Sequence, residues 1–112
     1  MPNSNQQFHI SELLNKAVRH HHSGEQKQAE KIYKKILEMN PNHPDALHLL
    51  GVIMHHSDQH NLAIDLIKKA IEVDSRQSFY FNNLGNVYND LSEFIEAAQC
   101  FHKALNSAPP IL

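Results

Sequence analysis

Several residue types are scarce in this chain of 112 residues, and each scarcity excludes a class of protein. The single cysteine, Cys100, cannot form an internal disulfide, so nothing indicates an oxidising compartment. Only three glycines are present, and they form no glycine-rich phosphate loop. No apolar run approaches the ~18 residues of a membrane span, and residues 1–7 lack the apolar stretch of a signal peptide. We therefore expect a soluble, cytoplasmic protein.

Excess charge of one sign is also missing. The formal net charge is -2 and the pI is about 6.5, which gives no reason to expect binding to nucleic acid or to an anionic membrane. One local cluster of lysines, Lys27, Lys31, Lys34 and Lys35, is better explained as a solvated helix face than as a phosphate-binding stripe.

The chain also lacks a catalytic constellation. No serine or cysteine is accompanied by a matched base, and Cys100 falls on the apolar side of a predicted helix, where a core role is expected. We therefore predict no enzymatic activity within these residues and no cofactor.

What the sequence does contain is an internal period of 34 residues with no insertion or deletion. Residues of one kind recur at this step in many columns, which makes coincidence very improbable. The clearest columns are Leu13, Leu47 and Phe81; Ala17, Gly51 and Gly85; Ala29, Ala63 and Ala97; Tyr33, Ile67 and Phe101; and Leu37, Ile71 and Leu105.

Each unit has the pattern of two amphipathic helices. Apolar residues recur at i, i+3, i+4, i+7 and i+8 from Ala63, and the same spacing follows Ala29 and Ala97. A capping-box pattern, Ser23 with Gln26, predicts the start of the second helix in the first unit. We predict an all-α domain over residues 9–110, with units at about 10–43, 44–77 and 78–111, preceded by a disordered or extended segment, residues 1–8.

These columns resemble the tetratricopeptide repeat family. The third unit carries the family pattern in Phe81, Leu84, Gly85 and Tyr88, then Ala97 and Phe101, then Pro109, with phenylalanine where tryptophan is usual. The first unit departs most, with Lys16 and His20 in place of leucine and tyrosine. The resemblance covers roughly residues 10–110. It implies three stacked helical hairpins in a short right-handed superhelix, an α-solenoid, that binds a protein or peptide in a concave groove.

A finer resemblance links two stretches to the repeats that precede the catalytic region of protein O-linked N-acetylglucosamine transferases, including SPINDLY-like proteins. Residues 48–52 read His-Leu-Leu-Gly-Val, and residues 82–88 read Asn-Asn-Leu-Gly-Asn-Val-Tyr. In that family, groove asparagines are thought to hold the substrate backbone. The matching column here holds Asn15, Leu49 and Asn83, so it is interrupted in the middle. The alternative function is therefore the substrate-recruiting region of such a transferase, whose catalytic domain is absent from this chain.

The family geometry also implies which residues line the groove. Asparagine carries both a donor and an acceptor, so it pairs with a peptide bond whatever the residue type, although a solvated asparagine is an equally good interpretation. These inward columns lack lysine and arginine, which argues against a clamp for a C-terminal carboxylate. The predicted groove residues are Asn15, His22, His48, Val52, His56, Asn82, Asn83, Asn86, Asn89 and Asp90.

Ten histidines raise the alternative of a metal site. His21 and His22 occupy the same columns as His55 and His56, but neighbours on a helix point about 100° apart, so each pair supplies one ligand easily. No metal site is therefore predicted. We expect instead that the groove gains positive charge in mild acid.

The end of the chain gives one further expectation. Family arrays usually finish with a polar-faced capping helix, and none follows Pro109 and Pro110. We expect a fragment of a longer protein, an apolar flank around Ile95, Ala98 and Cys100 that is partly exposed, and self-association or helix exchange through this end.

Overall fold

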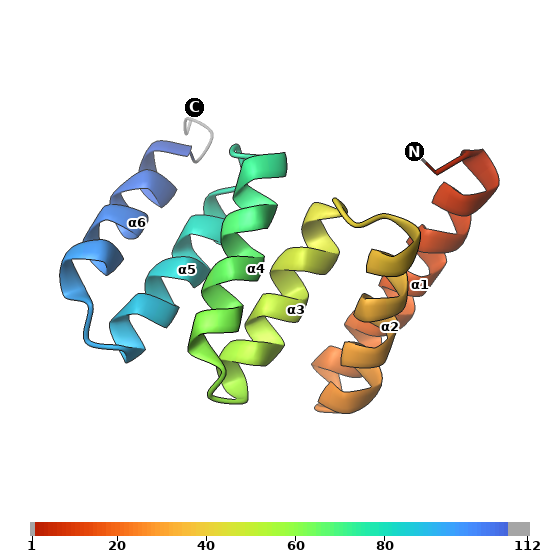
Figure 1. Ribbon diagram of the computed structural model, residues 1–112, viewed down its shortest axis with the longest axis horizontal. Coiled ribbons are helices and arrows are strands. Elements are labelled where there is room, and N and C mark those ends of the chain that lie inside the picture. Colours follow the sequence, from red (N-terminus) through yellow and green to blue (C-terminus); the bar gives the residue numbers. More distant parts are fainter. Residues whose placement is uncertain (1, 108–112) are drawn as a thin grey trace.

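The computed structural model describes residues 2–107, and these residues form six α-helices (Figure 1). They are α1 (Ser4–His22), α2 (Gln26–Met39), α3 (Pro44–His56), α4 (His60–Val73), α5 (Ser78–Asp90) and α6 (Phe94–Ser107). The predicted all-α fold is therefore confirmed, and α3 and α5 begin at the first residues predicted for the second and third units. The predicted ends of the third unit and of the domain lie outside the described residues.

The helices pair as antiparallel hairpins that stand side by side along the chain (Figure 1). Each odd-numbered helix packs on the helix that follows it, and α2 and α4 then pack on the first helix of the next hairpin. In Figure 1 the chain colours progress across the molecule from hairpin to hairpin, so the described part of the array is an α-solenoid.

The repeated apolar columns form one continuous core. In α2 the buried residues are Ala29, Tyr33 and Ile36, and the same spacing buries Ala63, Ile67 and Ala70 in α4. Burying a large apolar side chain is worth roughly 1.5–3 kcal/mol, so this stripe holds each second helix against its neighbours on both sides.

Small residues let the two helices of a hairpin approach closely. A Cβ atom added to Gly51 would lie 2.7 Å from Ile67 Cγ1 and 3.3 Å from the backbone oxygen of Ala63. At Gly85 an added Cβ would lie 2.6 Å from Phe101 Cε1. The glycines of this column are therefore needed for packing between helices.

Each hairpin turn uses the same backbone conformation. Gly24, Asp58 and Ser92 stand 34 residues apart and have φ angles of 78°, 62° and 59°, in the left-handed region. In the first turn, Glu25 N donates to His20 O at 2.8 Å, and Gly24 N donates to His21 O at 3.1 Å. These two bonds, repeated in the other turns, make a Schellman motif that satisfies the last carbonyls of the first helix.

Two local expectations about helix starts are wrong. Residues 4–8 belong to α1 and are not disordered or extended, because Asn3 and Gln6 form a capping box in which each side chain bonds the other residue's backbone N–H at 2.9 Å. The capping box expected from Ser23 does not form. Ser23 is instead the C-cap of α1, and α2 begins after Glu25.

The outward sides of the first helices differ in character. The columns that hold Ala46, Leu50 and Ile53 in α3 are equally buried in α5, where they hold Tyr80, Leu84 and Val87. In α1 the same columns hold polar residues that are exposed, namely Glu12, Lys16 and Arg19. Since α3 and α5 pack on a preceding hairpin, these columns are apolar there, whereas in α1 they face solvent.

Helix α6 exposes several large apolar side chains. Ile95 is 74% exposed and Leu105 is 77% exposed, and Phe94 and Ala98 are also exposed. The expected exposure of this flank is therefore found for Ile95 and Ala98. It is wrong for Cys100, which is buried because its column packs on the core.

Candidate functional site

Three pairs of polar residues join α3 directly to α5. Asp45 bonds Tyr80, His48 bonds Asn83 and His55 bonds Asp90, and the partners in each pair stand 35 residues apart. The first helices of successive hairpins therefore lie side by side with a stagger of one residue beyond the repeat. We call the surface formed by α1, α3 and α5 the inner face.

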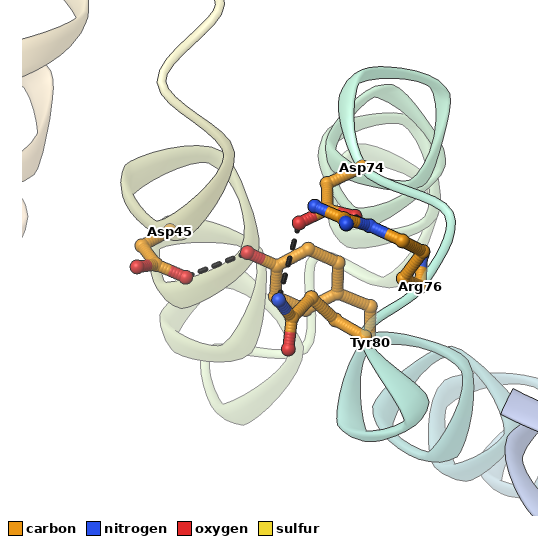
Figure 2. A network of polar contacts seen from close by, with 5 residues as sticks. Asp45, Asp74, Arg76 and Tyr80 are labelled. Atoms are coloured by element: carbon orange, nitrogen blue, oxygen red, sulfur yellow. Dashed lines mark hydrogen bonds and ion pairs between the residues drawn. The ribbon is translucent and has the colours of Figure 1, made fainter. Parts of the chain in front are cut away.

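Tyr80 connects the start of α3 to the loop before α5. Figure 2 shows its hydroxyl pointing at Asp45, and the hydroxyl donates to Asp45 Oδ1 at 2.6 Å. Burial and this bond raise the pKa of Tyr80, so the phenol keeps its proton. Beside it, Asp74 accepts from Gln77 Nε2 at 3.1 Å and from the backbone N–H of Arg76 at 3.1 Å, and these bonds lower the pKa of Asp74. The loop that positions α5 is thus fixed by hydrogen bonds.

His48 is a core residue of this hairpin junction. Only 2% of its surface is exposed, and its ring lies 4.6 Å from Tyr80 and 5.5 Å from Phe79, measured between ring centroids. Burial lowers the pKa of His48 to about 4, so the ring is neutral at pH 7. Its assignment to the groove lining is wrong, because neighbouring rings cover it.

Asn83 completes this junction and does not point freely into a groove. Its Nδ2 donates to His48 Nε2 at 2.7 Å, which places the His48 proton on Nδ1. That Nδ1 is buried and has no hydrogen-bond partner among residues 2–107. Asn83 is half-buried, and its amide N–H is already used, so it has less capacity to hold a ligand than the sequence suggested.

The other predicted groove residues keep solvent contact on the first helices. Val52 is half-buried, whereas the polar members of the set are exposed. The last turns of the three helices carry most of the charged and imidazole groups. The exposed members are Asn15 and His22 on α1, His56 on α3, and Asn82, Asn86, Asn89 and Asp90 on α5.

Asp90 is held by a histidine of the preceding hairpin. His55 Nε2 donates to Asp90 Oδ2 at 2.6 Å, and the Asp90 side chain is 55% exposed. The His55 ring also lies 5.6 Å from His56 and 5.3 Å from His60, between centroids. An acidic side chain and several imidazoles therefore meet at one end of the inner face.

Within residues 2–107, no group of three or more His, Cys, Asp or Glu side chains converges in a way that could hold a metal ion. A hollow of about 530 Å³ opens at the α5–α6 end of the array. It is lined by Ser78, Phe79, Asn82, Phe101, Ala104 and Leu105, so one predicted groove residue faces a mainly apolar recess.

Three participants in this arrangement were missed by sequence reasoning, namely Asp45, Tyr80 and Phe79. They belong to columns whose residue type changes from unit to unit, so a search for repeated residues passes over them. The available signal was a step of 35, which connects complementary partners such as Asp45 with Tyr80.

Three family models, each described as a tetratricopeptide repeat, match residues 13–43, 32–65 and 80–108. Together they cover most of the chain and agree with the hairpins seen in the structure. The chain belongs to the tetratricopeptide repeat family. The first match closely follows the first hairpin, whereas the second runs from α2 across α3 into α4.

The similar proteins include a glycosyltransferase from a plant and one from a bacterium. A probable SPINDLY peptide N-acetylglucosaminyltransferase of Solanum lycopersicum is 30% identical over 70% of this chain and 8% of its own length. The O-GlcNAc transferase of Thermobaculum terrenum, as a K341M mutant, superposes with a TM-score of 0.92 at 28% identity, over 96% of this chain and 21% of that one.

A third similar structure is the second repeat domain of Spaghetti, also named RPAP3, bound to the HSP90 peptide SRMEEVD. It has a TM-score of 0.86 at 18% identity and covers 94% of this chain and 90% of that one. The chain spans 8% to 35% of the length of the curated relatives that it matches. No helix within residues 2–107 combines the length and apolar character needed to cross a bilayer.

Proposed function

We propose that this tetratricopeptide repeat array is a protein-interaction module that binds an extended peptide segment along the inner face. The observation that carries the proposal is the alignment of α1, α3 and α5 by contacts 35 residues apart, with exposed amides along the same helices. An extended strand of partner protein offers backbone N–H and C=O groups, and an asparagine side chain can pair with both.

The neighbouring domain of Spaghetti supports this reading through its fold alone. That domain is bound to an HSP90 peptide, so a backbone of this shape is compatible with a peptide ligand. The inner-face columns of this chain lack lysine and arginine. We therefore expect its ligand at neutral pH to be recognised mainly through backbone hydrogen bonds.

A pull-down compares the wild-type array with a double variant, Asn86→Ala plus Asn89→Ala. Both side chains are exposed on α5, so the change should leave the fold intact and remove two amide contacts. The matched control is Asn61→Ala, an exposed asparagine on α4. Partners retained by wild type and control but lost by the double variant support the proposal. Equal recovery by all three arrays contradicts it.

A second candidate function is recruitment of substrates for a protein O-GlcNAc transferase. It is favoured by the match to the Thermobaculum enzyme over 96% of this chain and by the tomato SPINDLY protein. In the first function the array is a free-standing adaptor or scaffold. The test is to read the gene beyond Leu112. A nucleotide-sugar-binding region there supports recruitment, and a stop codon supports the free-standing adaptor.

A further inference from the structure

The two hairpin junctions differ at one equivalent pair of positions. At the junction of the second and third hairpins, His55 bonds the carboxylate of Asp90 at 2.6 Å. The positions 34 residues earlier are His21 and His56, so the first junction has an imidazole where the second has a carboxylate. The array thus contains one histidine–carboxylate pair and, one repeat before it, a histidine–histidine pair.

His21 lies among other imidazoles. Its Nδ1 is 3.2 Å from the Tyr33 hydroxyl of α2, and the charges that act on its ring are those of His56 on α3 and His22 on its own helix. The His21 ring also contributes to the field at His48. Burial and these two like charges lower the pKa of His21, so the cluster opposes its own protonation.

The outer side of the pair is open to a ligand. His56 is exposed at the C-terminal end of α3, and His22 is exposed at the end of α1. Helix C-termini carry partial negative charge, which favours protonated imidazole within the last turn. The nearest ring to His56 on its own helix, His55, is already bonded to Asp90.

From this geometry we infer that His21 and His56 form a subsite for a carboxylate of the bound peptide, an aspartate or glutamate side chain that takes the place Asp90 has at the second junction. The inference rests on the proposed function, because the peptide must already lie along the inner face. It names the class of side chain that the first junction selects.

Binding at such a subsite must be linked to protons. A carboxylate between two imidazoles stabilises their protonated forms, so the complex takes up protons and its affinity rises as the pH falls. The same array should therefore hold acidic peptides weakly at pH 7.5 and more tightly at pH 5.5.

The experiment uses the full chain and two fluorescently labelled probes with blocked ends, an extended peptide carrying a run of glutamates and the same peptide with glutamines. Fluorescence anisotropy gives the Kd of each probe at pH 7.5 and pH 5.5. We expect the glutamate probe to gain about threefold to tenfold in affinity on acidification, as one or two partly exposed ion pairs would give. The glutamine probe should change little.

Two substitutions at His56 separate the subsite from general charge. His56→Asp reproduces the histidine–carboxylate pair of the second junction and should abolish the gain, because its own carboxylate occupies His21. His56→Asn keeps a neutral polar residue and should weaken the gain to about threefold or less. Because position 56 is exposed, both variants should fold, and circular dichroism checks this.

The outcomes are distinguishable. If both probes bind but the glutamate probe gains nothing in acid, or gains equally in His56→Asp, the carboxylate subsite is refuted and the peptide-binding function stands. If neither probe binds at either pH, both the subsite and the binding of extended peptides are refuted. A gain confined to the glutamate probe and lost in His56→Asp establishes the subsite.

Discussion

Acid should destabilise the array through one buried side chain, His48. In the folded chain the pKa of His48 is lowered to about 4 by burial, whereas an unfolded histidine has a value of about 6.5. Below pH 6.5 the unfolded chain therefore binds a proton that the folded chain rejects. Stability is fully present above about pH 6.5, is lost as the pH falls to about 4, and changes no further below that through this residue.

The size of the effect follows from the difference between the two pKa values. A shift of one unit corresponds to about 1.36 kcal/mol, so the lowered pKa of His48 predicts a loss of about 3 kcal/mol between pH 7 and pH 4. The side chain is only 2% exposed, so solvent screening does not reduce this figure appreciably. A loss of this size is a large part of the stability of a small domain.

The assay is urea unfolding followed by circular dichroism at pH 7, 5.5 and 4, for the wild type and for His48→Gln. Glutamine keeps an acceptor for Asn83 Nδ2 but cannot be protonated, while every other titrating group is common to both chains. The wild type should lose about 3 kcal/mol more than the variant over this range. If His48→Gln folds poorly, His48→Leu, which copies Leu14 of the first unit, serves instead. Parallel pH profiles for wild type and variant would refute the reasoning.

Three further perturbations test other parts of the structure. Tyr80→Phe removes the 2.6 Å bond to Asp45 and should cost about 1–2 kcal/mol in urea unfolding; unchanged stability would mean that the bond is not formed in solution. Gly85→Ala places a methyl group 2.6 Å from the Phe101 ring and should lower the unfolding free energy by about 1–3 kcal/mol, unless the ring moves aside at no cost. Sedimentation should show self-association at high concentration that Leu105→Lys weakens, and a variant that associates like the wild type would place the contact elsewhere than on α6.

The architecture was predictable because the same columns are buried in every unit. A step of 34 residues fixes which apolar residues share a helix face, and the pairing of Gly51 with the helix of Ala63 and Ile67 follows from side-chain size alone. Helix starts were harder. Asn3 and Gln6 have the spacing of a capping box, but they lie outside the repeated columns, so the period gives no information about them.

The polar contacts of the inner face depend on how far successive hairpins are staggered, which no single unit encodes. A pair such as His48 and Asn83 becomes visible only when the shift of one residue beyond the repeat is known. The burial of His48 has the same origin, because its column is half-buried in α1, where it holds Leu14, and exposed in α5, where it holds Asn82. Identical columns thus meet different neighbours, and composition alone cannot predict the result.

The contrast between the outward side of α1 and those of α3 and α5 bears on how such an array can be lengthened by design. Residues 44–77 have apolar columns that match both a preceding and a following hairpin, so tandem copies of this segment should stack and extend the inner face. A copy of the first hairpin placed inside the array would instead bury Glu12, Lys16 and Arg19 against a neighbour. The middle segment is therefore suited to duplication, while the first hairpin is suited only to the outermost position.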